Sequence, residues 1–230
     1  MNKSESYKIF DQIAGTYDFL NRILSMGIDV YWRKEMIKKL PNGSNLEVLD
    51  LATGTADVAL TLAKEDRVKK ISGRDLSKEM IAIGQKKVKK ANKQDKISLE
   101  IGDATDIDAK DESFDLVTIS FGIRNFSDPD KSLREIYRVL KPSGRLLILE
   151  FSIPKNSMVR SLYFFYFRNL LPWVGNIVSK HKSAYTYLNE SVEDFPYGEQ
   201  FAQKMKAAGF KDVHYQSLTF GISTLYSSDK

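Results

Sequence analysis

The chain has 230 residues, of which 35 are lysine or arginine and 30 are aspartate or glutamate, so its formal net charge is +5. It contains no cysteine, which excludes disulfides, thiolate metal sites and cysteine nucleophiles. The two histidines, His181 and His214, lie far apart in the sequence, and we predict no metal site. The length fits one domain. The first residues contain no apolar signal-peptide core, so we expect a cytoplasmic protein.

Apolar residues recur at helical spacing from Tyr7 to Leu40, before any strand pattern begins. We therefore expect residues 1–45 to form a helical lid that lies across the mouth of a binding site.

Short apolar runs alternate with helical patterns from Leu46 to Phe151, which is typical of a parallel sheet with helices on both faces. The predicted strands are Glu47–Leu51, Lys70–Asp75, Ile97–Gly102, Phe114–Ser120 and Arg145–Phe151. Helices are predicted from Ser77 to Ala91 and from Pro129 to Leu140. Asp128 caps the second of these, and Lys141-Pro-Ser-Gly144 ends it.

The last third of the chain adds an insertion and a second strand pair. Within residues 153–197, the stretch Ser161–Val178 is densely aromatic but too interrupted by polar residues and proline to span a bilayer. It either packs on the sheet or lines an apolar substrate passage. Residues 198–230 are predicted to form a helix, Gly198–Ala208, and a hairpin between Val213 and Tyr226, which completes a seven-stranded, mostly parallel sheet whose last strand is antiparallel.

A loop rich in small residues joins the first strand to the helix that Asp57 opens. Gly54 allows this loop to turn beneath a ligand, and Asp75, at the end of the next strand, is placed to bind two ribose hydroxyls. The pattern predicts a nucleoside-cofactor site in residues 46–152. An ordinary strand–turn–helix in which Asp57 only caps the helix is the alternative interpretation.

The charge of this loop favours one cofactor. A dinucleotide fingerprint needs a third glycine for approach to the pyrophosphate, and Asp57 stands at that position. Asp50 at the strand end and Asp57 at the helix start suit a ligand with positive groups, such as the ammonium and sulfonium of S-adenosylmethionine. We predict that cofactor and disfavour an NAD-dependent oxidoreductase.

Four motifs carry a resemblance to a known family. They are Phe10-Asp-Gln-Ile-Ala-Gly-Thr-Tyr-Asp18, Asp115-Leu-Val-Thr-Ile-Ser-Phe-Gly-Ile-Arg-Asn125, Arg138-Val-Leu-Lys-Pro-Ser-Gly-Arg-Leu-Leu-Ile-Leu-Glu-Phe-Ser152, and Tyr185-Thr-Tyr-Leu-Asn-Glu-Ser191 with Phe195-Pro196. From Phe10 to about Tyr226 the chain resembles the ubiquinone/menaquinone biosynthesis C-methyltransferases. The resemblance implies a Rossmann-like class I S-adenosylmethionine-dependent methyltransferase that acts on a prenylated quinol, converting a demethylmenaquinol to menaquinol or methylating a benzoquinol of ubiquinone synthesis.

The resemblance also implies roles for single residues. Those that contact the cofactor, beside Asp50 and Gly54 of the loop, are Thr55, Asp75, Asp103, Ala104 and Ser120. From the chemistry of methylation at carbon, our hypothesis is that Arg124 stabilises a phenolate or orders a water molecule that accepts the hydroxyl proton, and that Asn125, Tyr17 and Tyr187 position the ring.

Two other classes of function remain. A methyltransferase of the same fold acting on another small molecule is disfavoured by the Arg124-Asn125 pair. A non-catalytic protein that binds through a basic surface is disfavoured because the lysines from Lys86 to Lys96 fall on a helix and the turn after it, where a solvated face is expected. We predict no nucleic-acid partner and expect peripheral association with the inner face of a membrane. A homodimer is left open.

Overall fold

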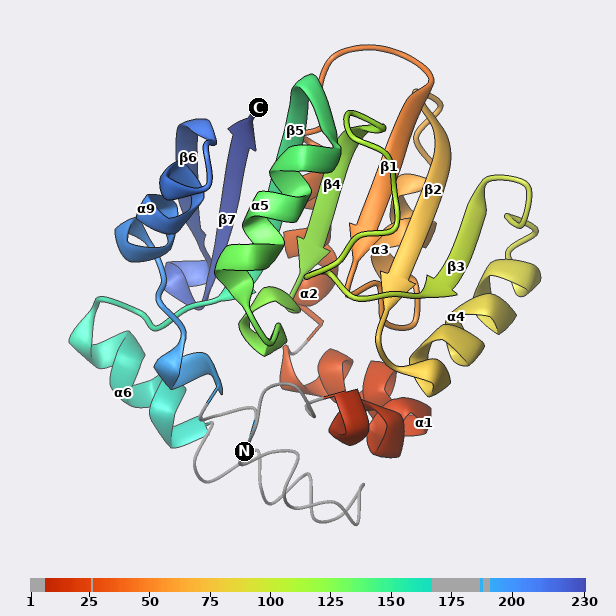
Figure 1. Ribbon diagram of the computed structural model, residues 1–230. Coiled ribbons are helices and arrows are strands. Elements are labelled where there is room, and N and C mark those ends of the chain that lie inside the picture. Colours follow the sequence, from red (N-terminus) through yellow and green to blue (C-terminus); the bar gives the residue numbers. More distant parts are fainter. Residues whose placement is uncertain (1–6, 26, 167–186, 188–190) are drawn as a thin grey trace.

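The computed structural model describes residues 7–25, 27–166, 187 and 191–230, and the strands in these ranges form one sheet in the order β3-β2-β1-β4-β5-β7-β6 (Figure 1). The strands are β1 (Leu46–Leu51), β2 (Val68–Asp75), β3 (Ile97–Ile101), β4 (Phe114–Ser120), β5 (Leu140–Phe151), β6 (Lys211–Leu218) and β7 (Ser223–Asp229). The first five pair in parallel, and β7 runs antiparallel to both of its neighbours. This confirms the predicted Rossmann-like α/β fold.

The strand β5 is longer than predicted. It begins at Leu140, directly after the preceding helix, because Lys141-Pro-Ser-Gly144 forms an irregularity within the strand rather than a separate helix end. Ser143 there has φ 63°, and a Cβ on Gly144 would lie 2.8 Å from the carbonyl oxygen of Lys141. The hairpin also extends beyond its predicted end, because Asp229 pairs with Arg145.

Helices flank the sheet on both faces, as predicted, with further helices at one end. They are α1 (Tyr7–Leu24), α2 (Asp29–Ile37), α3 (Asp57–Leu62), α4 (Lys78–Lys90), α5 (Pro129–Val139), α6 (Ser157–Phe165) and α9 (Glu199–Ala207), with the short 3-10 helices η2 (Ile123–Asn125) and η4 (Thr219–Gly221). The hydroxyl of Ser77 accepts a hydrogen bond from the amide of Met80 and caps α4. No helix among the described residues is long and apolar enough to cross a bilayer.

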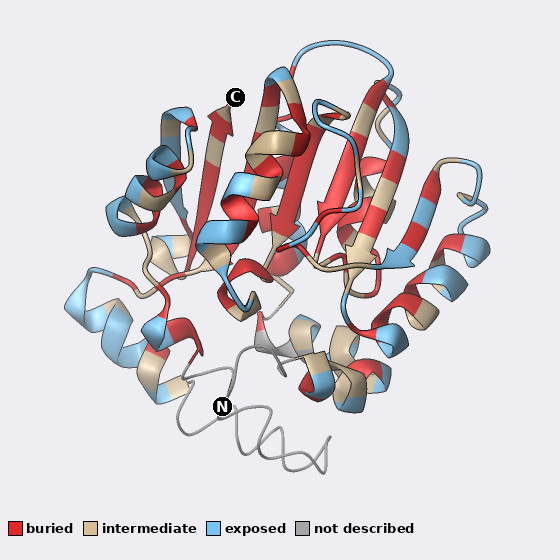
Figure 2. Ribbon diagram, in the orientation of Figure 1, coloured by how far each residue is buried: buried red, intermediate tan, exposed pale blue. Residues whose placement is uncertain are grey.

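Alternate residues of the buried strands feed two apolar cores. On β1, Val48 packs with residues of α2, α3 and α4, whereas Leu49 packs on the other face with residues of α5 and α9. Figure 2 shows the consequence: the central strands are almost continuously buried, and the flanking helices expose their outer faces. This pattern is typical of a sheet covered on both sides.

The two N-terminal helices differ in how they are held. On α2, Trp32 and Met36 are buried in the core on the sheet, and the indole Nε1 of Trp32 donates to Thr219 Oγ1 at 2.7 Å. By contrast, α1 lies beyond the carboxyl ends of the parallel strands (Figure 1). Only α1 therefore lies where the predicted lid would be.

The predicted cap of α5 gives the first test. Asp128 has extended backbone, and its Oδ1 accepts from the amide of Lys131 at 2.8 Å. We expect Asp128→Ala to lower the free energy of unfolding by about 0.5–2 kcal/mol, measured by urea denaturation. Asp130→Ala is the matched control, since it removes an exposed carboxylate from the same first turn and should cost only a few tenths of a kcal/mol, about what a surface charge contributes. Equal losses would show that Asp128 does not act as a cap.

Candidate functional site

The carboxyl ends of β1, β2 and β4 border a cleft of about 700 Å³, counting the open space at its mouth. Of the predicted site residues, those that line the cleft are Tyr17, Gly54, Asp75, Asp103, Ala104, Ser120 and Asn125. The lining residues that sequence reasoning did not assign to the site are Tyr7, Phe10, Leu51, Ala52, Arg74, Leu76, Met80, Gly102, Phe121, Gly122, Phe126 and Ser127. Phe10 could have been found, because it lies about two helical turns before Tyr17 and so on the same helix face.

The loop after β1 turns through left-handed backbone. Ala52, Gly54 and Ala56 have φ values of 51°, 55° and 68°. Alanine pays a conformational penalty in this region that glycine avoids, so the loop is held in place by its surroundings. Across the cleft, Gly122 is required for space, because a Cβ there would lie 2.3 Å from the Cβ of Ala52.

Asp75, which was predicted to bind the ribose hydroxyls, also binds the loop after β1. Its Oδ2 accepts from the amide of Gly54 and its Oδ1 from the amide of Ser77, both at 2.9 Å. Burial raises the pKa of Asp75, while these two amides oppose the shift. Each carboxylate oxygen keeps a further lone pair for a ligand hydroxyl.

Ser120 offers an independent sign of a ligand. Its Oγ is buried, and it has no hydrogen-bond partner among the described residues, although it borders the cleft. Buried polar atoms are normally paired, so this hydroxyl is placed to bind a polar group that enters the cleft.

Asp50 does not line the cleft. Its Oδ2 accepts from Thr53 Oγ1 and its Oδ1 from Thr118 Oγ1, both at 2.6 Å, so the carboxylate joins β1, β4 and the loop. Burial raises the pKa of Asp50 to about 6, and the two hydroxyls oppose the shift. The structure thus places Asp50 beneath the loop rather than against a ligand.

The charge argument from Asp57 is wrong. Its carboxylate is paired with the ammonium of Lys87, and Arg33 lies 3.5 Å away, so its charge is met within the protein. Thr55 is also engaged: its hydroxyl donates to Asp18 at 2.5 Å and accepts from Lys87 at 3.0 Å. The solvated face predicted for the lysines is therefore wrong for Lys87.

Lys96 is a second exception to that solvated face, because its ammonium donates to the carbonyl oxygens of Ala63 and Glu65 at 3.0 and 2.9 Å. Both lysines were misassigned for the same reason: their partners come from distant parts of the chain, which helical spacing does not reveal.

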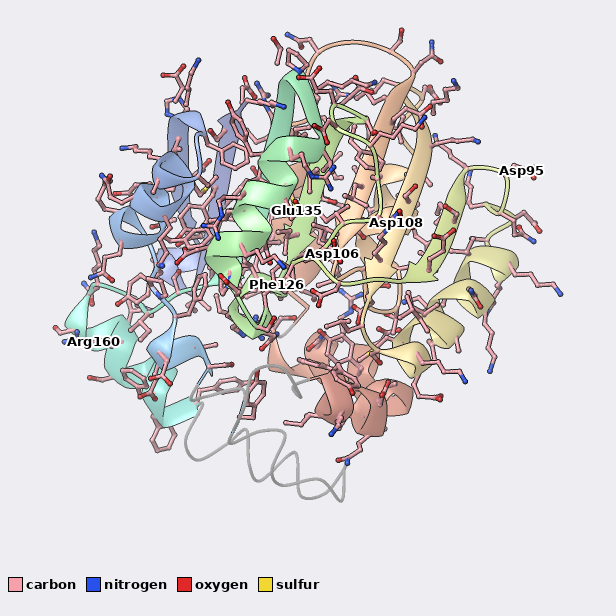
Figure 3. All side chains as sticks on the ribbon, in the orientation of Figure 1. Asp95, Asp106, Asp108, Phe126, Glu135 and Arg160 are labelled. Carbon is pink, nitrogen blue, oxygen red and sulfur yellow. The ribbon has the colours of Figure 1, made fainter. Side chains whose placement is uncertain are left out.

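The segment after β3 carries Asp103 and Ala104 and is clamped by α5. Figure 3 labels Asp106 and Asp108 on this segment and Glu135 on the neighbouring helix. Glu135 Oε2 accepts from the amide of Ile107 at 3.0 Å, and Arg138 donates to the carbonyl oxygens of Ile107 and Ala109 at 2.8 Å. These bonds fix the segment that borders the cleft.

Arg124 lies behind the cleft rather than on its lining. Its Nη1 donates to Glu150 Oε1 at 2.5 Å and to the carbonyl oxygen of Phe121 at 2.6 Å, and its Nε donates to Ser191 Oγ at 3.3 Å. The side chains of Arg124 and Glu150 are 4% and 1% exposed. Burial raises the pKa of Glu150, and the guanidinium opposes that shift. The predicted role of Arg124 as a group that touches the acceptor therefore has no geometric support here.

Tyr17 and Asn125 line the cleft, and Tyr187 contacts Asn125. The hydroxyl of Tyr187 donates to Asn125 Oδ1 at 3.0 Å. Burial raises the pKa of Tyr17, so its hydroxyl stays protonated and able to donate, although nearby Asn21 and Arg124 oppose the shift. Much of the closing motif (residues 185, 186 and 188–190) and of the aromatic insertion (residues 167–178) lies outside the described residues.

Comparisons with known sequences identify close relatives. A model of the ubiE/COQ5 methyltransferase family matches residues 1–230. The ubiquinone/menaquinone biosynthesis C-methyltransferase UbiE of Geotalea daltonii is 46% identical over 224 residues, which cover 97% of this chain and 95% of the relative. The demethylmenaquinone methyltransferase of Bacteroides fragilis is 41% identical over 229 residues, covering 99% and 94% of the two chains.

Solved structures share the fold at low identity. A S-adenosylmethionine-dependent methyltransferase of Thermotoga maritima aligns with a TM-score of 0.69 at 20% identity, covering 97% of this chain and 99% of that one. Phosphoethanolamine N-methyltransferase 2 of Haemonchus contortus, solved with S-adenosyl-L-methionine, aligns with a TM-score of 0.64 at 20% identity, covering 86% of this chain and 52% of that one. These likenesses establish the architecture alone.

The buried Asp50 gives a pH-dependent test of the site. Its pKa rises from the ordinary 3.8 to about 6 on folding, so the folded state binds the proton more tightly than the unfolded state. Stability from this group is therefore present below about pH 4 and falls as the pH rises to about 6. At roughly 1.4 kcal/mol per pKa unit, we expect the free energy of unfolding of Asp50→Asn to gain about 2–3 kcal/mol on the parent between pH 4 and pH 7.

Urea denaturation at several pH values measures this difference. Asp130→Asn, which removes an exposed carboxylate, corrects for the general effect of neutralising one acid. A difference between Asp50→Asn and the parent that stays constant across this range would contradict the burial of a titrating Asp50.

Proposed function

The chain belongs to the ubiE/COQ5 methyltransferase family, and from this premise we propose that it transfers a methyl group from S-adenosylmethionine to a ring carbon of a demethylmenaquinol, giving menaquinol. The observation that carries the proposal is identity of 41–46% over nearly the full length of relatives named for this chemistry. A benzoquinol of ubiquinone synthesis is a second acceptor of the same chemical class, since the relative from Geotalea daltonii is named for both quinones.

The cleft fits S-adenosylmethionine. Asp75 has lone pairs for the ribose hydroxyls, and Ser120 has a buried hydroxyl that lacks a partner among the described residues. Asp103 and Ala104 border the adenine end on a segment that α5 holds in place. Thr55 is not among the lining residues, and its hydroxyl is engaged by Asp18 and Lys87, so its role is to hold the loop that carries Gly54. When bound, the cofactor supplies an electrophilic methyl group on a sulfonium.

Two groups on the cleft wall position the acceptor ring. Asn125 lines the cleft, and its Oδ1 accepts from the hydroxyl of Tyr187, so this contact orients the Asn125 amide beside the acceptor ring. Tyr17 stays protonated and donates to the developing phenolate from the opposite helix. Alignment of the attacking carbon can account for several kcal/mol of the barrier.

Arg124 acts as a positioning residue. It is too basic to accept a proton, and its fork is occupied by Glu150, the Phe121 carbonyl oxygen and Ser191. It therefore fixes Phe121 and the adjoining Asn125 at the cleft, and its positive charge favours the ionised form of the acceptor. A water molecule in the cleft takes the hydroxyl proton.

Peripheral contact with a membrane fits the same function, because a prenylated quinol resides in the bilayer. On α6, Met158, Leu162 and Phe165 are 81%, 69% and 63% exposed and recur at helical spacing. This helix lies at the end of the molecule where the parallel strands terminate (Figure 1). Exposed apolar side chains at the cleft end of an enzyme are suited to a lipid interface.

The acceptor must be the reduced quinol, because a quinone ring is electron-poor and does not attack a sulfonium methyl. We expect methylated product only when a reductant accompanies S-adenosylmethionine and the naphthoquinone, with product identified by mass spectrometry. The oxidised quinone in the same mixture without reductant is the control. Methylation of both forms at equal rates would overturn the proposed chemistry. The same assay with a benzoquinol compares the methylation rates of the two acceptors.

Replacing Arg124 tests its positioning role. Arg124→Ala is unsuitable, because it leaves Glu150 buried and unpaired, at a cost of about 3–5 kcal/mol of stability. Arg124→Lys keeps the charge but loses the planar fork, and we expect kcat to fall roughly 10–100-fold while KM for S-adenosylmethionine changes little. Arg145→Lys in the middle of β5, where Arg145 pairs with Asp229, is the matched control and should keep the parent kcat. A kcat equal to the parent's in Arg124→Lys would contradict the positioning role of Arg124.

A further inference from the structure

The helix α1 covers the cleft with aromatic residues. Tyr7, Phe10 and Tyr17 all line it, and the rings of Phe10 and Tyr17 meet edge to face with centroids 6.0 Å apart. These side chains form one wall of the proposed cofactor site. A ligand that fills the cleft is therefore in contact with α1, and movement of α1 would open that wall.

Apolar burial does not tie α1 to the core. Ile9 and Ala14 are the buried apolar residues among the α1 side chains that the structure describes, and neither belongs to the two apolar cores. This differs from α2, whose Trp32 and Met36 are core residues. The sheet and its flanking helices are thus complete without α1.

Polar contacts hold α1 instead. Near its end, Arg22 Nη1 donates to Asp29 Oδ1 of α2 at 3.0 Å, and two further contacts hold α1 to segments beside the cleft. In the first, Asp18 Oδ1 accepts from Thr55 Oγ1 at 2.5 Å, and Asp18 Oδ2 accepts from Lys87 Nζ at 2.9 Å. Lys87 also donates to Thr55 Oγ1 and to Asp57, so its single ammonium joins α1, the loop after β1, the start of α3 and α4. Without Lys87, the carboxylates of Asp18 and Asp57 would lie close together and repel each other.

In the second contact, Asp11 Oδ1 accepts from Ser77 Oγ at 2.5 Å and from the amide of Glu79 at 3.2 Å. Ser77 is also the residue whose amide binds Asp75. Both contacts therefore end on segments that border the proposed cofactor site: the loop that holds Gly54 and the turn that holds Asp75.

We propose that Asp18, Thr55 and Lys87, assisted by Asp11 and Ser77, form a latch that holds α1 closed over the cofactor, so that Asp18 and Lys87 are positioning residues that set how long S-adenosylmethionine stays bound. The inference rests on the proposed function for the identity of the ligand. The latch itself is built from side chains that are only part-buried, which makes opening far less costly than unfolding the core.

The dissociation rate of S-adenosylmethionine tests the latch. We expect Asp18→Asn to raise this rate, measured by stopped-flow fluorescence, roughly 5–30-fold, the factor expected on losing one charge-assisted hydrogen bond. Lys87→Met, which removes the bonds to Asp18, Thr55 and Asp57, should raise it at least as much. Lys86→Met, at the exposed neighbouring position of α4, is the matched control and should leave the rate unchanged. Thermal midpoints should stay near that of the parent, because the apolar cores are intact.

The cysteine-free chain allows a second, ligand-independent measurement. A single Ala14→Cys change places a thiol at a buried position of α1, and its labelling rate reports how often α1 lifts. We expect labelling to speed up when Asp18→Asn is added, and S-adenosylmethionine to slow it in the parent background.

The two measurements separate the failures. If the parent binds no S-adenosylmethionine, the proposed function falls, while faster labelling in Asp18→Asn would still support the latch. If the parent binds S-adenosylmethionine, but the variants release it at the parent's rate and their thiol is labelled at the parent's rate, the latch is overturned and the proposed function stands.

Discussion

The site depends on one buried carboxylate. Asp50 binds a hydroxyl from the loop after β1 and another from β4, so it fixes the spacing of the two strand ends between which the cleft opens. That spacing leaves room for Gly122 against Ala52 and brings the Gly54 amide to Asp75. The carboxylate has no cationic partner among the described residues, which is why burial raises its pKa. The loop after β1 takes left-handed backbone at Ala52 and Ala56, and such strained backbone persists only where surrounding contacts hold it in place. The fold tolerates the cost of burying the Asp50 carboxylate because that carboxylate helps to hold the loop.

A second buried acid is stabilised differently from Asp50, because it has a cationic partner. Glu150, at the end of β5, is paired with Arg124, and the pair lies behind the cleft wall. A buried ion pair adds little net stability compared with well-packed apolar residues, so its value lies in orientation. The guanidinium fork holds one carboxylate, one main-chain carbonyl and one hydroxyl at once, and lysine cannot reproduce that arrangement. The guanidinium is thereby held in one orientation behind the cleft wall and shielded from solvent.

Sequence reasoning recovered the parts of the structure that depend on local pattern. The strands β1, β2 and β4 follow from apolar runs of the right length, and the cap of α5 follows from Asp128 at the helix start. It could not recover contacts between distant segments. Lys87 meets Asp18 and Asp57 from positions 69 and 30 residues away, and helical spacing alone made it a solvated lysine. The same limit explains Asp57: its position suggested a cationic ligand, but the cation is supplied by the protein. The prediction of S-adenosylmethionine as cofactor is confirmed, but the part of the charge argument that rested on Asp57 is wrong.

The helices α1 and α2 are held by different interactions, and this difference bears on how the cleft opens. The apolar face of α2 is used to complete the core, so that helix cannot move without exposing Trp32 and Met36. The inward face of α1 carries aromatic rings toward a ligand and acids toward Thr55, Lys87 and Ser77. A helix held by a few part-buried polar bonds opens at a small fraction of the free energy of unfolding, and ligand contacts with its aromatic face then favour the closed form. Closure would separate the cleft from bulk solvent, which would strengthen the electrostatic effect of Arg124 and Asp75 on whatever is bound there. The opening motif therefore pairs each aromatic with an acid: Phe10 precedes Asp11, and Tyr17 precedes Asp18, so that each turn that faces the ligand is also tied to the segment that binds it.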